Sequence, residues 1–203
     1  MKLIFDYGIG NSKSILNMMQ RIGLEAEIGT SEEQVERADF CILPGVGSFD
    51  SCVKSFTETE SSDYLLHRIA NGLNVLGICV GMQMLFESSE EGELPGLSLI
   101  PGKVIRFDFK DKDLQEKIPH MSWNYLEVKK DIEYFRNYSY KPKFYFVHSF
   151  HADCLDKYVS SYSHYGYQFP ASVKRGNING FQFHPEKSHV HGKKLLTEFF
   201  YAC

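Results

Sequence analysis

Short apolar runs and amphipathic stretches alternate along the first half of the chain. Apolar runs typical of buried strands occupy residues 2–7, 25–29, 39–45 and 74–78. Apolar positions with helical spacing follow the first run, at residues 15, 18, 19 and 22, and Gly23 stands where a C-terminal cap is expected. Helices are also expected over residues 62–71 and 81–89. Strands that alternate with helices in this way predict a parallel sheet with helices on both faces.

The texture changes from about residue 99. Short segments rich in aromatic and β-branched residues follow one another, broken by Gly, Pro and Asn, and they predict a mostly β second half. A last helix is expected over residues 190–201, with Leu195, Leu196 and Phe199 on one side. No linker or repeat separates the halves, and neither is long enough for a comfortable core of its own. We therefore expect residues 1–203 to form one α/β domain.

Composition and charge narrow the functional classes. Of the 203 residues, 43% are hydrophobic and 24% are charged, the mixture of a soluble globular protein. The formal net charge is −4 with acids and bases interleaved, so the chain lacks a basic footprint for nucleic acid. No apolar run approaches the roughly 18 residues that cross a membrane, and the N-terminus lacks the apolar centre of a signal peptide. We expect a cytoplasmic protein without nucleic-acid or membrane partners.

Cysteine and histidine positions argue against a metal centre. The five cysteines are widely spaced and include no CxxC pair, which disfavours both a disulfide framework and a zinc site. Four of them are expected to be small buried hydrophobic residues: Cys41, Cys52, Cys154 and Cys203. The histidines form no HxxxH pair, and the glycines of residues 8–10 belong to no phosphate-binding or dinucleotide motif. Neither a metal nor an organic cofactor is expected.

The fifth cysteine stands in the pattern Gly77-Ile78-Cys79-Val80-Gly81. The pattern follows a predicted strand and precedes a predicted helix, which is the context of a nucleophile elbow, a sharp turn that needs small flanking residues. Such a turn would lift the sulfur into a cleft at the end of the strand, where a helix N-terminus would favour the thiolate. The alternative is a buried cysteine beside a glycine turn, because GxCxG alone is a weak motif.

A thiol nucleophile needs a base, and the base needs a group that fixes its tautomer. Among eight histidines, His184 is distinguished by the segment FQFHPE (181–186), where an alternating strand ends and Pro185 stiffens the turn. Glu186 would then lie within reach of Nδ1 of His184. A surface histidine beside a glutamate is the alternative, and the pairing with the elbow at Cys79 is what favours a Cys–His–Glu arrangement.

These residues resemble those of a known family. GICVGMQ (77–83) together with FQFHPEKS (181–188) is similar to the motifs of the class I, or triad, glutamine amidotransferases. Four further segments resemble the glutaminase subunits of imidazole glycerol phosphate synthase: DYGIGN (6–11), LPGVGSF (43–49), PHMSWN (119–124) and YFVHSF (145–150). The resemblance covers nearly the whole chain in the right order. It implies the class I amidotransferase fold, an open, largely parallel, flavodoxin-like sheet flanked by helices with a β-rich second half.

The resemblance also implies roles for particular residues. Cys79 would form a γ-glutamyl thioester with the substrate glutamine, His184 would move the proton, and Glu186 would orient the imidazole. The other implied residues are oxyanion donors at Val46, Gly47 and Val80, glutamine-binding residues at Gln83, Glu91, His148 and Ser149, and partner-facing residues at Asn11, Trp123, Asn124 and Lys187. The implied partner is a (β/α)₈-barrel cyclase that forms a heterodimer with the glutaminase and uses its ammonia to make imidazole glycerol phosphate and AICAR in histidine biosynthesis. An oxyanion peptide of this family is thought to reorient with the partner, so low activity of the chain alone is expected.

Two departures from the family pattern leave the destination of the ammonia open. Ser122 stands where the family has glycine in PHMGWN, and Phe150 stands where a tyrosine usually completes HSY or HTY. One alternative is therefore a paralogous glutaminase whose partner amidates a sugar in surface-glycan biosynthesis. Two others are a stand-alone thiol hydrolase, which would need neither PHMSWN nor the PGVG segment, and a binding module without catalysis, which the intact Cys79, His184 and Glu186 oppose.

Overall fold

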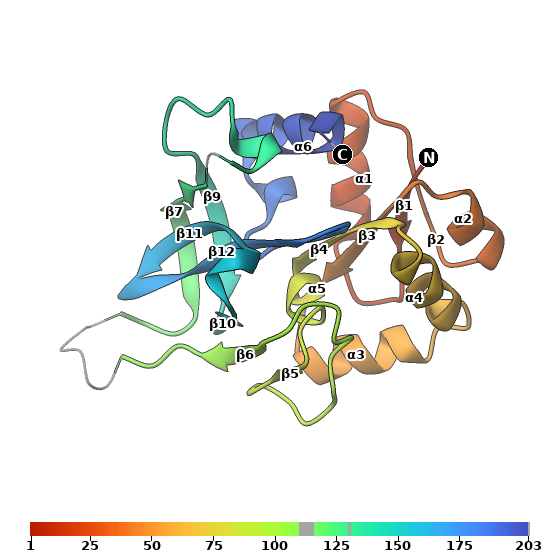
Figure 1. Ribbon diagram of the computed structural model, residues 1–203, viewed down its shortest axis with the longest axis horizontal. Helices are drawn as coiled ribbons and strands as arrows, with labels where there is room; N and C mark the ends of the chain where they lie inside the picture. The colour runs from red at the N-terminus through yellow and green to blue at the C-terminus, as the bar shows by residue number, and fades with distance from the viewer. Residues whose placement is uncertain (110–115, 130, 203) are drawn as a thin grey trace.

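The computed structural model describes residues 1–109, 116–129 and 131–202, and an eight-stranded sheet forms its centre (Figure 1). The strands lie in the order β2-β1-β3-β4-β13-β12-β11-β8. The first five are parallel: β2 (Ala26–Gly29), β1 (Lys2–Phe5), β3 (Phe40–Gly45), β4 (Asn74–Cys79) and β13 (Ile178–Phe181). The last three are antiparallel: β12 (Tyr167–Arg175), β11 (Val159–Tyr165) and β8 (Glu127–Val128). The prediction of an open, largely parallel sheet is confirmed.

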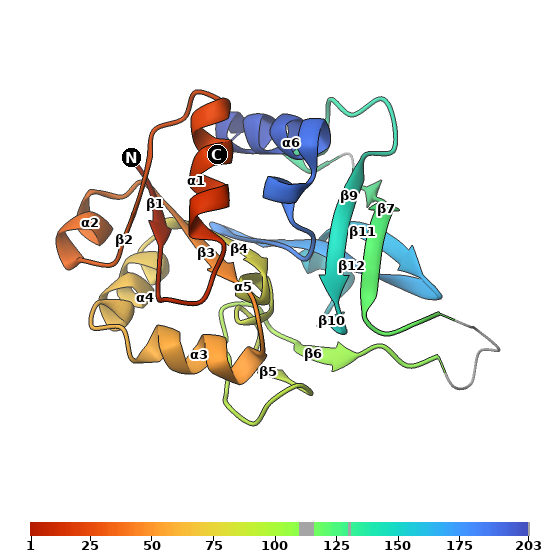
Figure 2. The same ribbon diagram turned by 180° about the vertical axis from the view of Figure 1, so that it is seen from behind.

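Helices cover both faces of the parallel half (Figures 1 and 2). On one face lie α1 (Ser12–Arg21) and α6 (His189–Ala202). On the other lie α3 (Phe49–Thr57), α4 (Ser62–Ala70) and α5 (Val80–Gln83). The predicted apolar stripe of α1 is buried at Ile15, Met18 and Met19. The helix ends at Arg21, and Gly23 follows its cap with a φ of +77° that suits glycine. The N–H of Gly23 bonds to the carbonyl of Gln20 at 3.0 Å.

One helical expectation needs correction, and two helices were not expected. The helix predicted over residues 81–89 ends at Gln83. The following Met84, Leu85 and Phe86 are all buried, and their carbonyls accept hydrogen bonds from the N–H groups of residues 97–100 instead of continuing the helix. A helix of one turn has little dipole, so the expected support for a thiolate from a helix N-terminus is much reduced. The unexpected helices are α3, capped by the Ser48 side chain, and α2 (Glu32–Arg37), which begins with a capping box at Ser31.

Two further small sheets are built mostly from the β-rich second half. One contains β10 (Phe150–Asp153), β6 (Lys103–Arg106) and β5 (Ser88–Ser89), and the other pairs β7 (His120–Tyr125) with β9 (Lys143–His148). Short 3₁₀ turns occupy Glu133–Phe135, Asp156–Tyr158 and Pro185–Lys187. Buried residues from both halves join one hydrophobic core. Of the four cysteines expected to be buried, Cys41 and Cys52 are buried and Cys154 is half-buried, while Cys203 lies outside the described residues.

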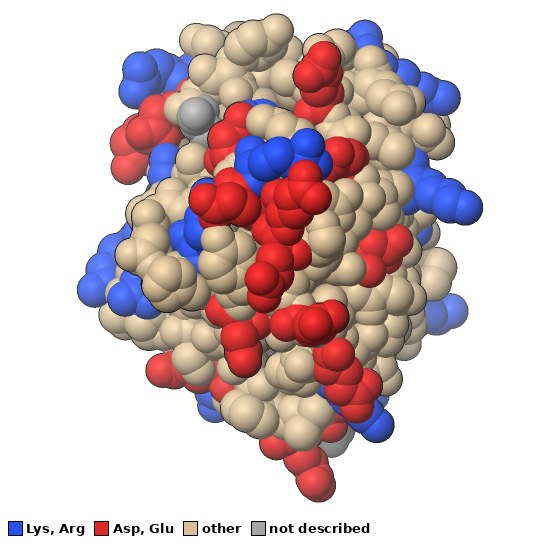
Figure 3. All heavy atoms as spheres, turned by 90° about the vertical axis from the view of Figure 1, so that its right-hand side faces the viewer, with Lys and Arg blue, Asp and Glu red and all other residues tan. Residues whose placement is uncertain are grey.

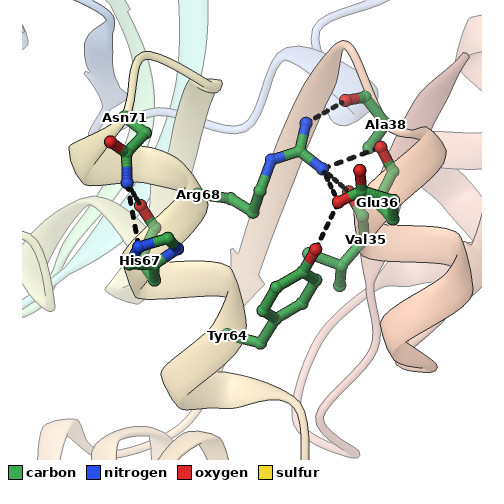
Figure 4. Close-up of polar contacts among 7 residues, drawn as sticks. All are labelled: Val35, Glu36, Ala38, Tyr64, His67, Arg68 and Asn71. Atoms are coloured by element: carbon green, nitrogen blue, oxygen red, sulfur yellow. Dashed lines mark hydrogen bonds and ion pairs between the residues drawn. The ribbon is translucent and has the colours of Figure 1, made fainter.

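The surface at the β2 edge of the sheet is acidic, and an arginine there connects α4 with the end of α2. Asp and Glu side chains gather on the face seen in Figure 3, which includes α2 and α4. Arg68 of α4 donates to the carbonyls of Val35, Glu36 and Ala38 at the end of α2, and it pairs with the Glu36 carboxylate at 2.7 Å (Figure 4). Tyr64 donates to the same carboxylate. None of the helices within the described residues has the length and apolarity needed to cross a membrane.

Candidate active site

Cys79 ends β4 in a strained turn. Its φ of 57° and ψ of −115° are unusual for a residue with a side chain, as a nucleophile elbow requires. The flanking glycines are needed for space. A Cβ on Gly77 would lie 2.4 Å from the carbonyl oxygen of Gly81, and a Cβ on Gly81 would lie 2.0 Å from that of Leu43. The turn therefore places the thiol beyond the carboxyl end of a central strand.

The PGVG segment lies directly against this turn. Gly45, the last residue of β3, is paired in register with Cys79. A Cβ on Gly45 would lie 2.3 Å from the backbone nitrogen of Gly81, so the two backbones touch and only glycine fits. Val46, Gly47 and the elbow residue Val80 consequently border the same cavity as Cys79.

A second cysteine, whose role was not predicted from the sequence, contacts the backbone of the PGVG segment. The thiol of Cys52, on α3, donates to the carbonyl oxygen of Val46 at 3.4 Å. Burial raises the pKa of Cys52 to about 11, so the thiol keeps its proton and can donate. The buried hydroxyl of Tyr7 lies in the same group and donates to the carbonyl of Pro44. The only available signal was the helical spacing that puts Cys52 on the buried side of α3.

His184 and Glu186 form a buried pair. The imidazole Nδ1 lies 2.8 Å from Oε1 of Glu186, and the side chains are 2% and 1% exposed. Burial opposes a charge on His184, but hydrogen bonds and charge attraction from Cys79 and Glu186 outweigh it and raise the pKa of His184 to about 9. The structure thus brings together a cysteine at the end of β4 and a histidine and a carboxylate from the segment that follows β13.

The strand before His184 ends earlier than expected. β13 stops at Phe181, and the next residues cross from one sheet to the other. Gln182 N–H bonds to the carbonyl of Ala171 on β12, whereas His184 N–H bonds to the carbonyl of Tyr145 on β9, each at 2.9 Å. The base is therefore held between two sheets, which accounts for its fixed position.

A cavity of about 390 Å³ opens over the thiol. Its volume lies in the range of small-molecule sites. All four residues expected to bind glutamine line it, namely Gln83, Glu91, His148 and Ser149. Lys187 lines it too. Pro119, Val147 and Phe150 also line it, although no role was predicted for the first two. Their positions inside the PHMSWN and YFVHSF segments were the available signal.

The polar side chains of this cavity are held by hydrogen bonds to the backbone and to Gln182. Gln83 uses its amide nitrogen to donate to the carbonyl of Phe150 and to the side chain of Gln182, each at 3.1 Å. Glu91 accepts from the N–H of Phe49 at 2.9 Å, and burial raises the pKa of its carboxyl. Within the described residues, no three His, Cys, Asp or Glu side chains are grouped as metal ligands.

The residues expected to face a partner differ in how exposed they are and in what they contact. Trp123 on β7 is 38% exposed and stacks on the ring of His189, and Lys187 is exposed. Asn11 precedes α1 and is partly exposed. Asn124 is also partly exposed, but it alternates with Trp123 along the strand and its amide donates to the carbonyl of His164 at 2.6 Å.

Comparison with known proteins points to one family. The family model for class-I glutamine amidotransferases matches residues 3–203. Imidazole glycerol phosphate synthase subunit HisH of Leptospira borgpetersenii is 40% identical over 97% of this chain and 97% of its own length. Subunit HisH 2 of Methanococcus maripaludis is 42% identical over 97% of this chain and 96% of its own length. A solved glutamine amidotransferase, 20% identical, shares the fold with a TM-score of 0.76 over 99% of this chain and 97% of its own.

Proposed function

The chain belongs to the class-I glutamine amidotransferases, and from that premise we propose that it hydrolyses glutamine and delivers the ammonia to a synthase partner. The observation that carries this proposal is the buried His184–Glu186 pair beside a strained Cys79, over a cavity of about 390 Å³. We expect the reaction to take place in the cytoplasm, where the metabolites of such a synthase are found.

The chemistry starts at the Cys79 thiol. His184 holds the thiol proton as an imidazolium, as its raised pKa favours, and the sulfur attacks the side-chain amide carbon of glutamine. The C–N bond then breaks as His184 gives that proton to departing ammonia. Water, deprotonated by His184, attacks the resulting γ-glutamyl thioester and releases glutamate. Glu186 fixes the Nδ1–H tautomer and stabilises the imidazolium in each step, as the 2.8 Å bond between the two side chains supports.

Other residues bind the substrate and its developing charge. The Val46–Gly47 segment and the amide of Val80 are the proposed oxyanion donors, since they border the cavity beside the thiol. Glu91 would pair with the ammonium group of glutamine, and this cation would favour the charged form of a carboxyl whose pKa is raised by partial desolvation. His148 and Ser149, which also line the cavity, would contribute through their backbone.

The partner would bind the outer face of β7. Met121, Trp123 and Tyr125 are exposed there at alternate positions, 59%, 38% and 53% respectively, which is typical of an interface rather than of a free surface. This face adjoins Lys187, which lines both the active-site cavity and a second hollow beside Val190. By analogy with the synthase subunits that it resembles, the proposed partner is a (β/α)₈-barrel cyclase that forms imidazole glycerol phosphate and AICAR in histidine biosynthesis.

The test is glutamate release by this chain mixed with the cyclase of the same organism, with and without the ribonucleotide substrate of the cyclase. Strong stimulation by that substrate, lost in Cys79→Ala, is the expected result. A competent cyclase that accepts free ammonia but gives no stimulation would contradict the histidine-pathway assignment. The isolated chain is a poor readout, because one missing oxyanion donor is worth roughly 10²–10³ in turnover.

A second destination for the ammonia is favoured by specific substitutions. Ser122 adds a side chain at a family glycine on β7, and Phe150 replaces a tyrosine at the cavity wall. A paralogue that supplies ammonia to a sugar-amidating partner would keep the glutaminase chemistry and respond to that partner instead.

A further inference from the structure

Two buried histidines connect the strand that carries Trp123 with the wall of the glutamine cavity. His120 on β7 and His148 on β9 are directly paired in the two-stranded sheet, on its inner face. Nδ1 of His120 lies 3.0 Å from Nε2 of His148, and Nδ1 of His148 lies 2.7 Å from the carbonyl oxygen of Phe150. Both rings are buried, so these contacts are not exchanged with water.

The contacts determine where the protons are. A carbonyl oxygen only accepts, so Nδ1 of His148 carries the proton and its Nε2 accepts when the ring is neutral. Nδ1 of His120 must therefore donate to His148, which leaves Nε2 of His120 as an acceptor facing the amide of Asn124 at 3.5 Å. Burial lowers the pKa of His120 to about 4 and that of His148 well below its ordinary value, so both rings are neutral.

One end of this series of contacts lies at the cavity over Cys79, and the other lies beside the exposed Trp123. At one end, the carbonyl of Phe150 also accepts from the amide of Gln83 at 3.1 Å, and Gln83, His148 and Phe150 all line the cavity over Cys79. At the other end, Asn124 is adjacent in sequence to the exposed Trp123. A movement of β7 would change the His120–His148 contact first, because the two rings are cross-strand neighbours.

We propose that His120 is a positioning residue that holds His148, the Phe150 carbonyl and the Gln83 amide in the geometry that binds glutamine, and that it transmits docking on β7 to this cavity. The inference rests on the proposed function for its substrate and its partner. His120 itself does not line the cavity and touches no reacting atom. Its effect should therefore fall on glutamine binding and on partner stimulation rather than on thiol chemistry.

The chain offers matched variants. His120→Asn places an amide nitrogen near the position of Nδ1 and keeps the donor to His148, whereas His120→Gln places its amide near Nε2 and loses that donor. The control is His151→Phe. His151 is a buried histidine of the same aromatic cluster, with its ring centre 4.6 Å from that of Phe107, but its ring nitrogens contact the Ala152 carbonyl and the Tyr167 hydroxyl.

The first experiment measures glutamine affinity by calorimetry in a Cys79→Ala background, where no turnover occurs. His120→Gln should weaken binding about tenfold, the effect of leaving one buried acceptor unsatisfied, while His120→Asn and His151→Phe stay within about twofold of the parent. Equal losses in His120→Gln and His120→Asn, or in His120→Gln and His151→Phe, would overturn the proposal. Because binding is read without catalysis, the outcome is independent of whether the chain releases ammonia.

The second experiment measures partner stimulation of glutamate release in the same variants with Cys79 intact. The expected result is a raised KM and a reduced stimulation factor in His120→Gln, with near-normal values in His120→Asn. Wild-type stimulation in His120→Gln would overturn the coupling role. Thermal unfolding of each variant checks that the fold is intact, and nitrogen NMR of the imidazoles should show His148 as the neutral Nδ1–H tautomer, a signature that an unconnected ring would lack.

Discussion

Replacing Glu186 by glutamine removes one charge from the buried pair and keeps its shape. The glutamine oxygen can still accept from Nδ1 of His184, so the change isolates the electrostatic contribution. In the wild type the pKa of His184 rises from 6.5 to about 9, which corresponds to roughly 3 kcal/mol in favour of the imidazolium. Cys79 supplies part of this effect and Glu186 the rest. We expect the pKa of His184 to fall by about one unit or more in Glu186→Gln.

The sign of the pH dependence follows from the direction of the shift. Because the folded-state pKa of His184 is raised, its contribution to the free energy of unfolding is fully present below pH 6.5 and is lost as the pH rises through about 9. The difference in unfolding free energy between the wild type and Glu186→Gln should therefore be larger at about pH 6 than at about pH 9.5, by about 1–3 kcal/mol. Glutamate release with the partner should fall about 10²–10⁴-fold.

The assay combines an NMR titration of the His184 ring with urea unfolding at the two pH values. Glu133→Gln is the control, since its carboxylate pairs with Lys174 at 2.8 Å on the surface and should leave His184 unchanged. An unchanged titration midpoint for His184 in Glu186→Gln, or a stability difference that grows with pH, would refute the reasoning.

Three further predictions concern the cavity, the turn and the partner face. Glu91→Gln should raise KM for glutamine about ten- to hundredfold in steady-state kinetics with the partner, because the substrate ammonium loses its carboxylate; an unchanged KM would contradict that role. Gly45→Ala should lower the free energy of unfolding in urea by about 1–3 kcal/mol, because its Cβ would lie 2.3 Å from Gly81 N; wild-type stability would show that the two turns can separate. Trp123→Ala should weaken partner binding in calorimetry by about 2 kcal/mol, whereas Tyr201→Ala, which removes an exposed aromatic of α6, should not; equal effects would move the interface away from β7.

Much of the parallel half could be predicted, because each central strand is an apolar run and α1 shows a clear stripe. The helix α3 was missed although its signal is present, since Phe49, Cys52, Val53 and Phe56 are buried at helical spacing. The early end of α5 had no such signal. Met84, Leu85 and Phe86 are apolar together, and an entirely buried segment does not reveal its conformation through periodicity.

The site was predictable only as far as its motifs reach. The nucleophile ends β4 and the base follows the end of β13, and the order β4-β13 in the sheet makes these strands neighbours, in agreement with the expected proximity. The support from Cys52 and the contact between His120 and His148 depend on packing and strand register, neither of which a single sequence reports. Asn124 illustrates the same limit, because only its place on the strand shows that it points inward.

The roles of Cys79 and His184 are tested most directly by trapping the nucleophile with a diazo-ketone analogue of glutamine, which alkylates a thiol in the glutamine site, and locating the label by peptide mass spectrometry. We predict one label per chain, on Cys79, that is lost in Cys79→Ala, suppressed by excess glutamine and strongly slowed in His184→Ala. A label on Cys52 or Cys154 in its place, or undiminished labelling in His184→Ala, would contradict the assignment of Cys79 and His184 as nucleophile and base.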